Sequence, residues 1–166
     1  FMQAIDECRN TMRDEVDSAD RFDEMGAVVT VVYISWPNAY VMHLGNNRAY
    51  HWRRKTVGQV TNDHTLARRL VDAGQLSKRQ ADLSPLRNVV WNVVGTQTET
   101  SYPEYREMDL GVDDAIILCS DGMAAAINEK EITRALDSTD SAEQTCRSLS
   151  ASAASSGFED DATIVV

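Results

Sequence analysis

The stretch Ala115-Ile-Ile-Leu-Cys-Ser-Asp121-Gly122 is the part of this 166-residue chain from which we interpret the rest. The apolar run Ala115 to Cys119 predicts a short strand buried on both faces, because too few polar side chains are present for a solvated face. Gly122 then allows a tight turn, and Asp121 stands where the strand leaves the core. A carboxylate in that place is costly unless a cap, an ion pair or a metal satisfies it.

A second acidic segment has the same arrangement. Glu159-Asp160-Asp161 precedes another predicted strand, Ala162 to Val166, and Asp113-Asp114 opens the first one. Two strands that carry carboxylates at their ends, far apart in sequence, predict a shared oxygen-ligand site for a hard cation such as Mg²⁺ or Mn²⁺. The alternative is structural, because an Asp-Gly pair after a strand is most often only a turn.

Length and charge exclude several classes of protein. The chain is long enough for one domain with a real core, and we expect a single domain over residues 1–166. Its net charge of −10 argues against nucleic acid or an anionic membrane as the main partner, although a metal can reverse the local sign for a phosphorylated substrate. No apolar run approaches the roughly 18 residues of a membrane span, and no signal peptide is recognisable. Three scattered cysteines favour neither disulfides nor zinc, so we expect a cytoplasmic protein.

The order of predicted elements indicates an α+β fold. Strands are grouped and joined by hairpins, as around Gly45-Asn46-Asn47, and this grouping favours antiparallel sheets over a doubly wound parallel sheet. Asp63 or Thr65 is expected to cap a helix that ends at Gly74. Further N-caps are predicted at Ser77, Asn128 and Ser141.

Six motifs, in order, resemble those of the metal-dependent protein serine/threonine phosphatases of the PP2C type, most closely the bacterial form. Together they extend over nearly the whole chain, which makes the combination specific where each motif alone is weak. They are Met25-Gly26-Ala27-Val28, Leu44-Gly45-Asn46-Asn47-Arg48-Ala49-Tyr50, Val60-Thr61-Asn62-Asp63-His64-Thr65 with Leu70-Val71-Asp72-Ala73-Gly74, Arg87-Asn88 through Gly95, Asp114 to Gly122, and Asp160-Asp161-Ala162-Thr163.

The resemblance implies two central antiparallel sheets flanked by helices, an α/β/β/α sandwich, with a binuclear Mn²⁺ or Mg²⁺ centre at one end. In that family a metal-activated water attacks the phosphorus of phosphoserine or phosphothreonine proteins. Carried over residue by residue, Asp121 and Asp160 match two metal-binding carboxylates with catalytic roles, and Gly122 lies in the site beside Asp121. Asp63, together with Asp121, matches a third metal position of bacterial members; the alternative for Asp63 is a helix N-cap.

The departures from the family pattern concern its first motifs. Arg-x-x-Asn-Glu-Asp and Asp-Gly-His-Gly-Gly are absent from these 166 residues, and the leading strands of the fold are expected to be missing with them. Asn46 replaces the hairpin aspartate, and Ala27-Val28 replaces two threonines. Asp161 replaces the terminal asparagine, which either strengthens cation binding or shifts the ligand by one residue. Unpaired sheet edges predict a dimer or a separate N-terminal piece.

Two functions remain open from the sequence. One is a phosphoprotein phosphatase whose upstream part is elsewhere, because both metal aspartates are intact. The other is a catalytically inactive phosphatase-like module that binds a phosphoprotein or a partner, because two carboxylates make a poor binuclear site. A sporulation-type phosphatase that regulates anti-sigma factors shares the fold, but the Asp63-His64-Thr65 segment favours the kinase-opposing type.

Overall fold

The computed structural model describes residues 1–18, 25–97, 99–139, 141–157 and 160–166. Most of the predicted loop at 17–24 and Glu159 of the acidic segment therefore lie outside the described residues. The chain divides into two compact units: the first comprises 1–31, 42–46 and 63–105, and the second 32–41, 47–62 and 106–166. In the described ranges, no helix combines the length and apolar character needed to cross a membrane.

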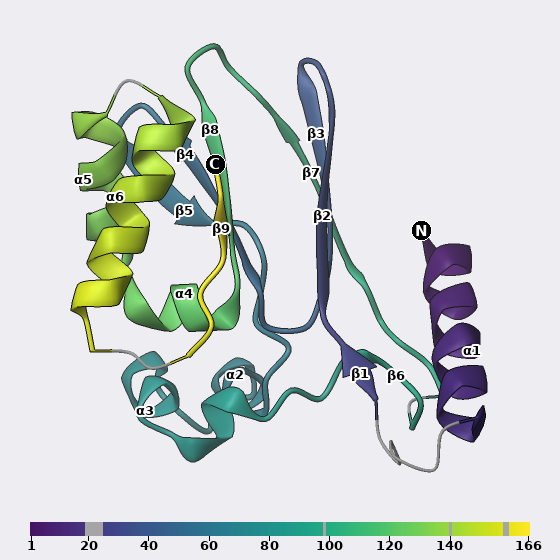
Figure 1. Ribbon diagram of the computed structural model, residues 1–166. Helices are drawn as coiled ribbons and strands as arrows, with labels where there is room; N and C mark the ends of the chain where they lie inside the picture. The colour runs from purple at the N-terminus through teal and green to yellow at the C-terminus, as the bar shows by residue number, and fades with distance from the viewer. Residues whose placement is uncertain (19–24, 98, 140, 158–159) are drawn as a thin grey trace. The chain divides into compact units, whose positions relative to one another are not determined.

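The second unit is built on a four-stranded sheet (Figure 1). Its strands occur in the order β5-β4-β8-β9, and all neighbours are antiparallel. The predicted strand is β8, which pairs with β4 from Arg48 opposite Cys119 to Trp52 opposite Ala115. Burial on both faces is not what the structure shows, because Ile117 and Cys119 are buried while Ile116 and Leu118, on the other face, are only half-buried. The four strands are β4 (Arg48–Arg53), β5 (Thr56–Gln59), β8 (Ala115–Cys119) and β9 (Ile164–Val165).

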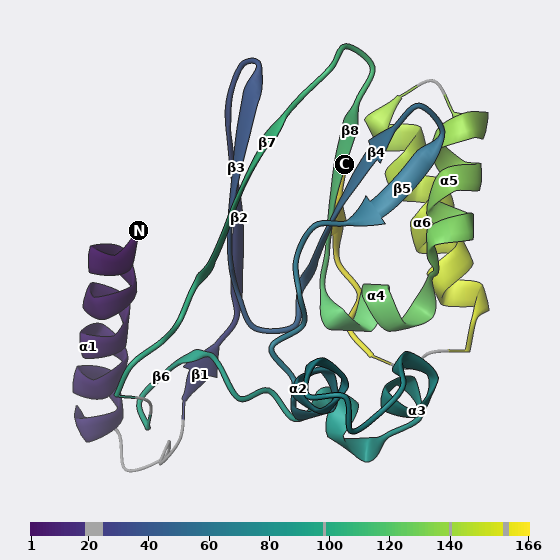
Figure 2. The same cartoon turned by 180° about the vertical axis from the view of Figure 1, so that it is seen from behind.

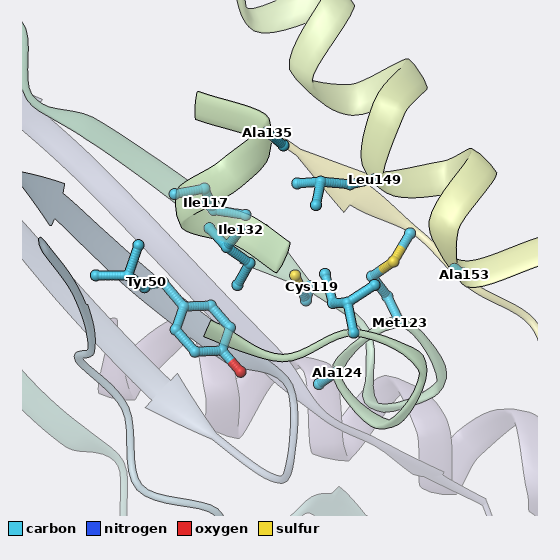
Figure 3. Packing of buried hydrophobic residues seen from close by; sticks show 11 residues of the cluster. Tyr50, Ile117, Cys119, Met123, Ala124, Ile132, Ala135, Leu149 and Ala153 are labelled. Carbon is cyan, nitrogen blue, oxygen red and sulfur yellow. The ribbon is translucent and has the colours of Figure 1, made fainter. Parts of the chain in front are cut away.

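Helices α4 (Asp121–Ala126), α5 (Glu129–Ser138) and α6 (Ala142–Ser155) pack on this sheet. The predicted N-caps at Asn128 and Ser141 are confirmed, because each side chain accepts hydrogen bonds from the first turn of its helix. Between sheet and helices lies a cluster of buried side chains, in which Ile117, Ile132 and Leu149 are fully buried (Figure 3). The apolar faces of three helices and one sheet therefore share one core.

A buried carboxylate joins two strands of this sheet. Asp114 accepts hydrogen bonds from Arg53 Nε at 2.8 Å and from the backbone N–H of Gly111, and its Oδ2 lies 2.8 Å from His51 Nε2. The Arg53 guanidinium, then the Gly111 amide and His51, hold the pKa of Asp114 well below its usual range in spite of burial. Asp114 thus links the start of β8 to Arg53 and His51 of β4. The sequence had indicated only that Asp113-Asp114 opens a strand.

The first unit contains more irregular structure. Helix α1 (Met2–Ser18) packs beside the short strand β6 (Val94–Gly95), and β6 pairs antiparallel with β1 (Gly26–Ala27). The contact between α1 and the loop after β6 includes a buried arginine: Arg9 donates to Ser101 Oγ at 3.0 Å and pairs with Asp6 at 2.8 Å. The apolar core here consists of Ile5, Leu44 and Val94, with two partly buried neighbours.

Short helical segments complete the first unit, and both views of the fold show two of them by label, α2 and α3 (Figures 1 and 2). They are α2 (Leu66–Asp72), α3 (Lys78–Asp82) and the 3₁₀ helix η1 (Pro85–Asn88). The predicted capping of α3 by Ser77 is confirmed, with Gln80 completing a capping box. Gly74 follows α2 with φ of +70°, the conformation for which glycine was expected there.

The remaining strands form a third sheet. Its order is β2-β3-β7, and the strands are β2 (Val29–Ser35), β3 (Asn38–Leu44) and β7 (Glu104–Asp109). Strand β2 is therefore an edge within the described chain, and it carries the exposed side chains of Val31, Tyr33 and Ile34. Helices together with antiparallel sheets confirm the predicted α+β class, whereas the single domain over 1–166 stays a prediction.

Candidate metal centre

The two acidic segments singled out in the sequence adjoin each other in the second unit. The backbone N–H of Ser120 donates to the carbonyl of Thr163 at 3.0 Å, and the N–H of Thr163 donates to Ser120 Oγ at 2.9 Å. Ser120 Oγ also accepts the N–H of Met123, as the N-cap of α4. One hydroxyl therefore begins a helix and holds the C-terminal segment beside it.

Gly122 is required for this close approach. A Cβ at this position would collide with the carbonyl oxygen of Asp161 and lie 3.5 Å from the Cβ of Asp160. The residue lies inside helix α4, so a tight turn, the role predicted for Gly122, is not what the structure shows. The alternative interpretation of Asp121-Gly122 as an ordinary turn is likewise not supported, because Asp121 is the first residue of a helix.

The carboxylates of Asp121 and Asp160 are both at the surface of this junction. Asp121 Oδ1 accepts the N–H of Gly122 at 2.9 Å, and Asp160 Oδ1 accepts the N–H of Asp161 at 2.9 Å. These contacts fix one oxygen of each side chain. Asp160 also borders an open cavity of about 220 Å³ between α4 and α6, so there is room beside the carboxylate.

The donor set fits a hard cation in part. Carboxylate oxygens suit Mg²⁺ and Mn²⁺, and Mg²⁺ is commonly held by one or two carboxylates with water and substrate phosphates completing its shell. Within the described ranges, however, no group of three or more His, Cys, Asp or Glu residues is arranged to hold a metal ion. Asp121 and Asp160 alone can therefore supply only part of a binuclear site.

Asp63, the third predicted ligand, lies in the first unit. The alternative that Asp63 caps α2 is wrong, because the N-cap is Thr65, whose hydroxyl accepts the N–H of Arg68. Asp63 is half-buried and precedes a tightly held residue, His64. It is thus not needed to cap the helix, and its role as a metal ligand stays a prediction.

His64 fixes the segment that carries Asp63. Its backbone N–H donates to the Gly45 carbonyl at 2.7 Å, and its carbonyl accepts the N–H of Trp91 at 3.0 Å. The ring Nδ1 accepts the N–H of Gly45 at 3.1 Å and lies 3.0 Å from Asn92 Nδ2. Burial, and then the neighbouring His43 ring, lower the pKa of His64, so the imidazole is held neutral.

The hairpin predicted around Gly45-Asn46-Asn47 is wrong, because β3 before it and β4 after it belong to different sheets. Gly45 instead brings the segment between these strands against His64. Its φ is +114°, and a Cβ there would collide with the side chain of Val28. Close packing thus fixes the backbone at Gly45, and Asn46 is buried where the family pattern has an aspartate. The sequence indicated a glycine with a special backbone conformation here, but no local pattern predicted the contacts of the His64 ring.

Comparisons with known proteins identify similar chains. No protein-family model matches the chain. The serine/threonine phosphatase stp of Listeria welshimeri is 25% identical over 142 residues, which are 86% of this chain and 56% of the relative. The protein phosphatase PhpP of Streptococcus pneumoniae is 29% identical over 126 residues, 76% of this chain and 51% of the relative. The chain thus spans about half the length of these curated relatives.

Solved structures agree in fold. The serine/threonine phosphatase Stp1 from Staphylococcus aureus matches with a TM-score of 0.91 and 23% identity, covering 99% of this chain and 64% of that one. The catalytic domain of the phosphatase PstP, in complex with two manganese ions, matches with a TM-score of 0.82, covering 95% and 64%. The resemblance that the six motifs predicted is confirmed.

Proposed function

We propose that this chain, which is similar in sequence and fold to the PP2C-type serine/threonine phosphatases, is the part of such a phosphatase that carries two of its metal-binding aspartates. Its activity would be hydrolysis of phosphoserine and phosphothreonine in proteins. The observation that supports this most directly is the junction of the Ser120–Met123 and Asp160–Thr163 segments, closed by Ser120 Oγ and made possible by Gly122. It brings together the two carboxylate segments that the family motifs single out.

In this proposal, Asp121 and Asp160 bind Mn²⁺ or Mg²⁺ in a binuclear centre, with Gly122 keeping the two segments in contact. Asp63 adds a ligand to a third ion, and His64 holds the segment of Asp63 in place. When bound, the cations would make water a better nucleophile and neutralise the phosphoryl oxygens. The remaining ligands would come from water and from residues outside this chain, since the matched phosphatases are longer.

The exposed edge of β2 supports a related proposal. Val31, Tyr33 and Ile34 are exposed along this strand, and an unpaired edge with apolar side chains favours pairing with another strand. We expect that strand to come from an upstream piece or from a second copy. The expectation would be contradicted if this chain alone sedimented as a well-behaved monomer. Free thiols at Cys8, Cys119 and Cys146 support the cytoplasmic location that we propose with this function.

The decisive experiment compares the chain with its Asp121→Asn variant, with Asp137→Asn as a control at an exposed aspartate on α5. Calorimetry measures Mn²⁺ binding, and phosphate release from a phosphothreonine peptide measures hydrolysis. We expect Asp121→Asn to abolish Mn²⁺ binding and any hydrolysis that the unaltered chain shows, and Asp137→Asn to change neither. Mn²⁺ binding without hydrolysis would indicate a centre that awaits its other ligands. The absence of both from the unaltered chain would favour the inactive binding module.

A further inference from the structure

An arginine and a tryptophan form an exposed pair in the first unit. The guanidinium carbon of Arg69, on α2, lies 5.4 Å from the ring centroid of Trp91, within the range of a cation–π contact. Trp91 is 38% exposed, so one part of its ring is open to solvent while another packs against His64 with centroids 5.5 Å apart. The Trp91 ring therefore packs against the buried ring of His64 and is still partly open to solvent.

Arg69 keeps its hydrogen-bonding capacity unused within the described part of the chain. Its neighbour Arg68 forms an ion pair with Asp72 at 2.9 Å, but no described carboxylate or carbonyl accepts from the Arg69 guanidinium. A guanidinium carries five N–H donors in a planar fork that suits phosphate and carboxylate groups. Stacking on Trp91 orients this fork, which reduces the entropy lost when an anion binds.

An exposed apolar side chain, Val89, lies close in sequence to Trp91 of this pair. Val89 is 43% exposed and two residues before Trp91, and Val90 between them bridges to Thr65 in extended backbone. Because side chains two apart in an extended segment point to the same side, Val89 and Trp91 face the same way. The surface formed by Arg69, Val89 and Trp91 therefore combines one oriented cation with exposed apolar area.

The charge distribution favours an anionic occupant. Residues 66–88 carry a net charge of +3, which leaves −13 on the rest of this −10 chain. Lys78 and Arg79 on α3 also have no acid partner within the described ranges. A phosphoprotein segment rich in Asp or Glu would be repelled by most of the chain and attracted here.

The surface is also continuous with the segment of a proposed metal ligand. The N–H of Trp91 donates to the carbonyl of His64, and Asp63 is the next residue. A peptide that lies on Trp91 therefore passes beside the Asp63 segment within the same unit. We propose that the surface formed by Arg69, Val89 and Trp91 binds an acidic segment of the phosphoprotein substrate next to its phosphorylated residue. This inference rests on the proposed phosphatase function, whose substrate class it narrows to phosphosites with acidic flanks.

The test measures peptide binding without catalysis. A fluorescein-labelled phosphothreonine peptide with glutamate flanks is titrated with the chain in EDTA, and its fluorescence anisotropy is followed at low and at moderate salt. We expect Arg69→Gln to weaken binding about tenfold, because it removes one charge-assisted contact, and to reduce the salt dependence. Trp91→Leu is expected to weaken binding as well, while Arg68→Gln changes it less than about twofold, because that charge is already paired.

Each outcome separates this inference from the function on which it rests. Binding that Arg69→Gln weakens and Arg68→Gln does not would support the docking surface, even if Mn²⁺ then promotes no hydrolysis and the phosphatase proposal fails. The inference is overturned if the unaltered chain does not bind the acidic peptide, binds a lysine-flanked phosphopeptide equally well, or loses affinity to the same extent in both arginine variants. Arg69→Gln decides the question alone if circular dichroism shows that Trp91→Leu is unfolded.

Discussion

The interiors of the two units of this protein are stabilised by different kinds of contact. In the second unit, eleven buried residues from β4, β5, β8 and the helices form one apolar cluster (Figure 3). In the first unit the apolar cluster has three buried members, Ile5, Leu44 and Val94, and buried polar groups such as His64 and Asn92 occupy much of the interior. Apolar packing therefore dominates the interior of the second unit, whereas hydrogen bonds between particular groups dominate the interior of the first.

This difference extends to the candidate site. Asp121 is presented by β8 and α4, which both contribute buried residues to the large apolar cluster, and Asp160 precedes β9, whose Ile164 packs against the same cluster. Asp63 depends on the contacts of a single histidine with Gly45, Trp91 and Asn92. Substitutions should therefore affect the two units through different mechanisms.

The largest loss of stability is expected from Leu149→Ala in the second unit. Leu149 is fully buried on α6 among side chains of α4, α5 and β8, which can relax only partly around a cavity. We expect a decrease in the free energy of unfolding of about 2–5 kcal/mol, measured by urea denaturation. Leu83→Ala, at a largely exposed position, is the control and should cost far less. A loss below about 1 kcal/mol for Leu149→Ala would mean that this core is not closely packed.

The next effect is expected in the first unit from Asn92→Leu, a change that keeps the branching of the side chain but removes the amide. Asn92 is buried, donates to the carbonyl of Tyr102 at 2.8 Å and accepts the N–H of Tyr102 at 3.0 Å. The variant leaves both backbone groups without these partners, at a cost of about 1–3 kcal/mol. Urea denaturation beside the exposed Asn88→Leu measures it. If Asn92→Leu were neutral or stabilising, the first unit would not depend on this polar contact.

The same difference explains how much the sequence could predict. The strand β8, the helices after it and their N-caps followed from apolar runs and local capping signals, which act over a few residues. A shared site for Asp121 and Asp160 was predicted because each stands at the end of a predicted strand, whereas the pairing of β8 with β9 in one sheet is known only from the structure. The division into two units did not follow, because contacts between residues far apart in sequence decide it.

The polar interior was beyond sequence reasoning. His64 and Asn92 are 28 residues apart, and Arg9 and Ser101 are 92 apart, so no local pattern signals either contact. The N-cap of α2 was left open between Asp63 and Thr65 because Asp and Thr both make good N-caps. The hydrogen bond that the Thr65 hydroxyl accepts from the Arg68 N–H identifies Thr65 as the N-cap and excludes that role for Asp63.

A smaller effect, visible only in acid, is expected from the polar contact of the second unit. The Arg53 guanidinium, the Gly111 amide and His51 keep the pKa of Asp114 below that of an unfolded aspartate, which is about 3.9. The unfolded chain therefore binds a proton first as pH falls, so the stability from Asp114 is present above about pH 4 and is lost below it. Urea denaturation between pH 5 and pH 2 should show a shallower decline for Asp114→Asn.

The neighbouring Asp113→Asn is a matched control for that experiment. Asp113 is exposed and has φ of +67°, a conformation that asparagine also tolerates. Its acid dependence should equal that of the unaltered chain. Equal slopes for all three proteins would show that the contacts of Asp114 with Arg53 and His51 do not persist in solution.

The smallest effects are expected at the surface, where the two units should behave alike. Arg68–Asp72 on α2 and Arg147–Glu143 on α6 are both ion pairs four residues apart, with distances of 2.9 Å and 2.6 Å. Exposed pairs of this kind contribute about 0.3–0.5 kcal/mol, because water screens the charges and the side chains lose entropy. Double-mutant cycles to alanine measure each coupling energy. Equal small values would confine the difference between the units to their interiors, whereas a coupling above about 1 kcal/mol on α2 would mean that surface charge also stabilises the first unit.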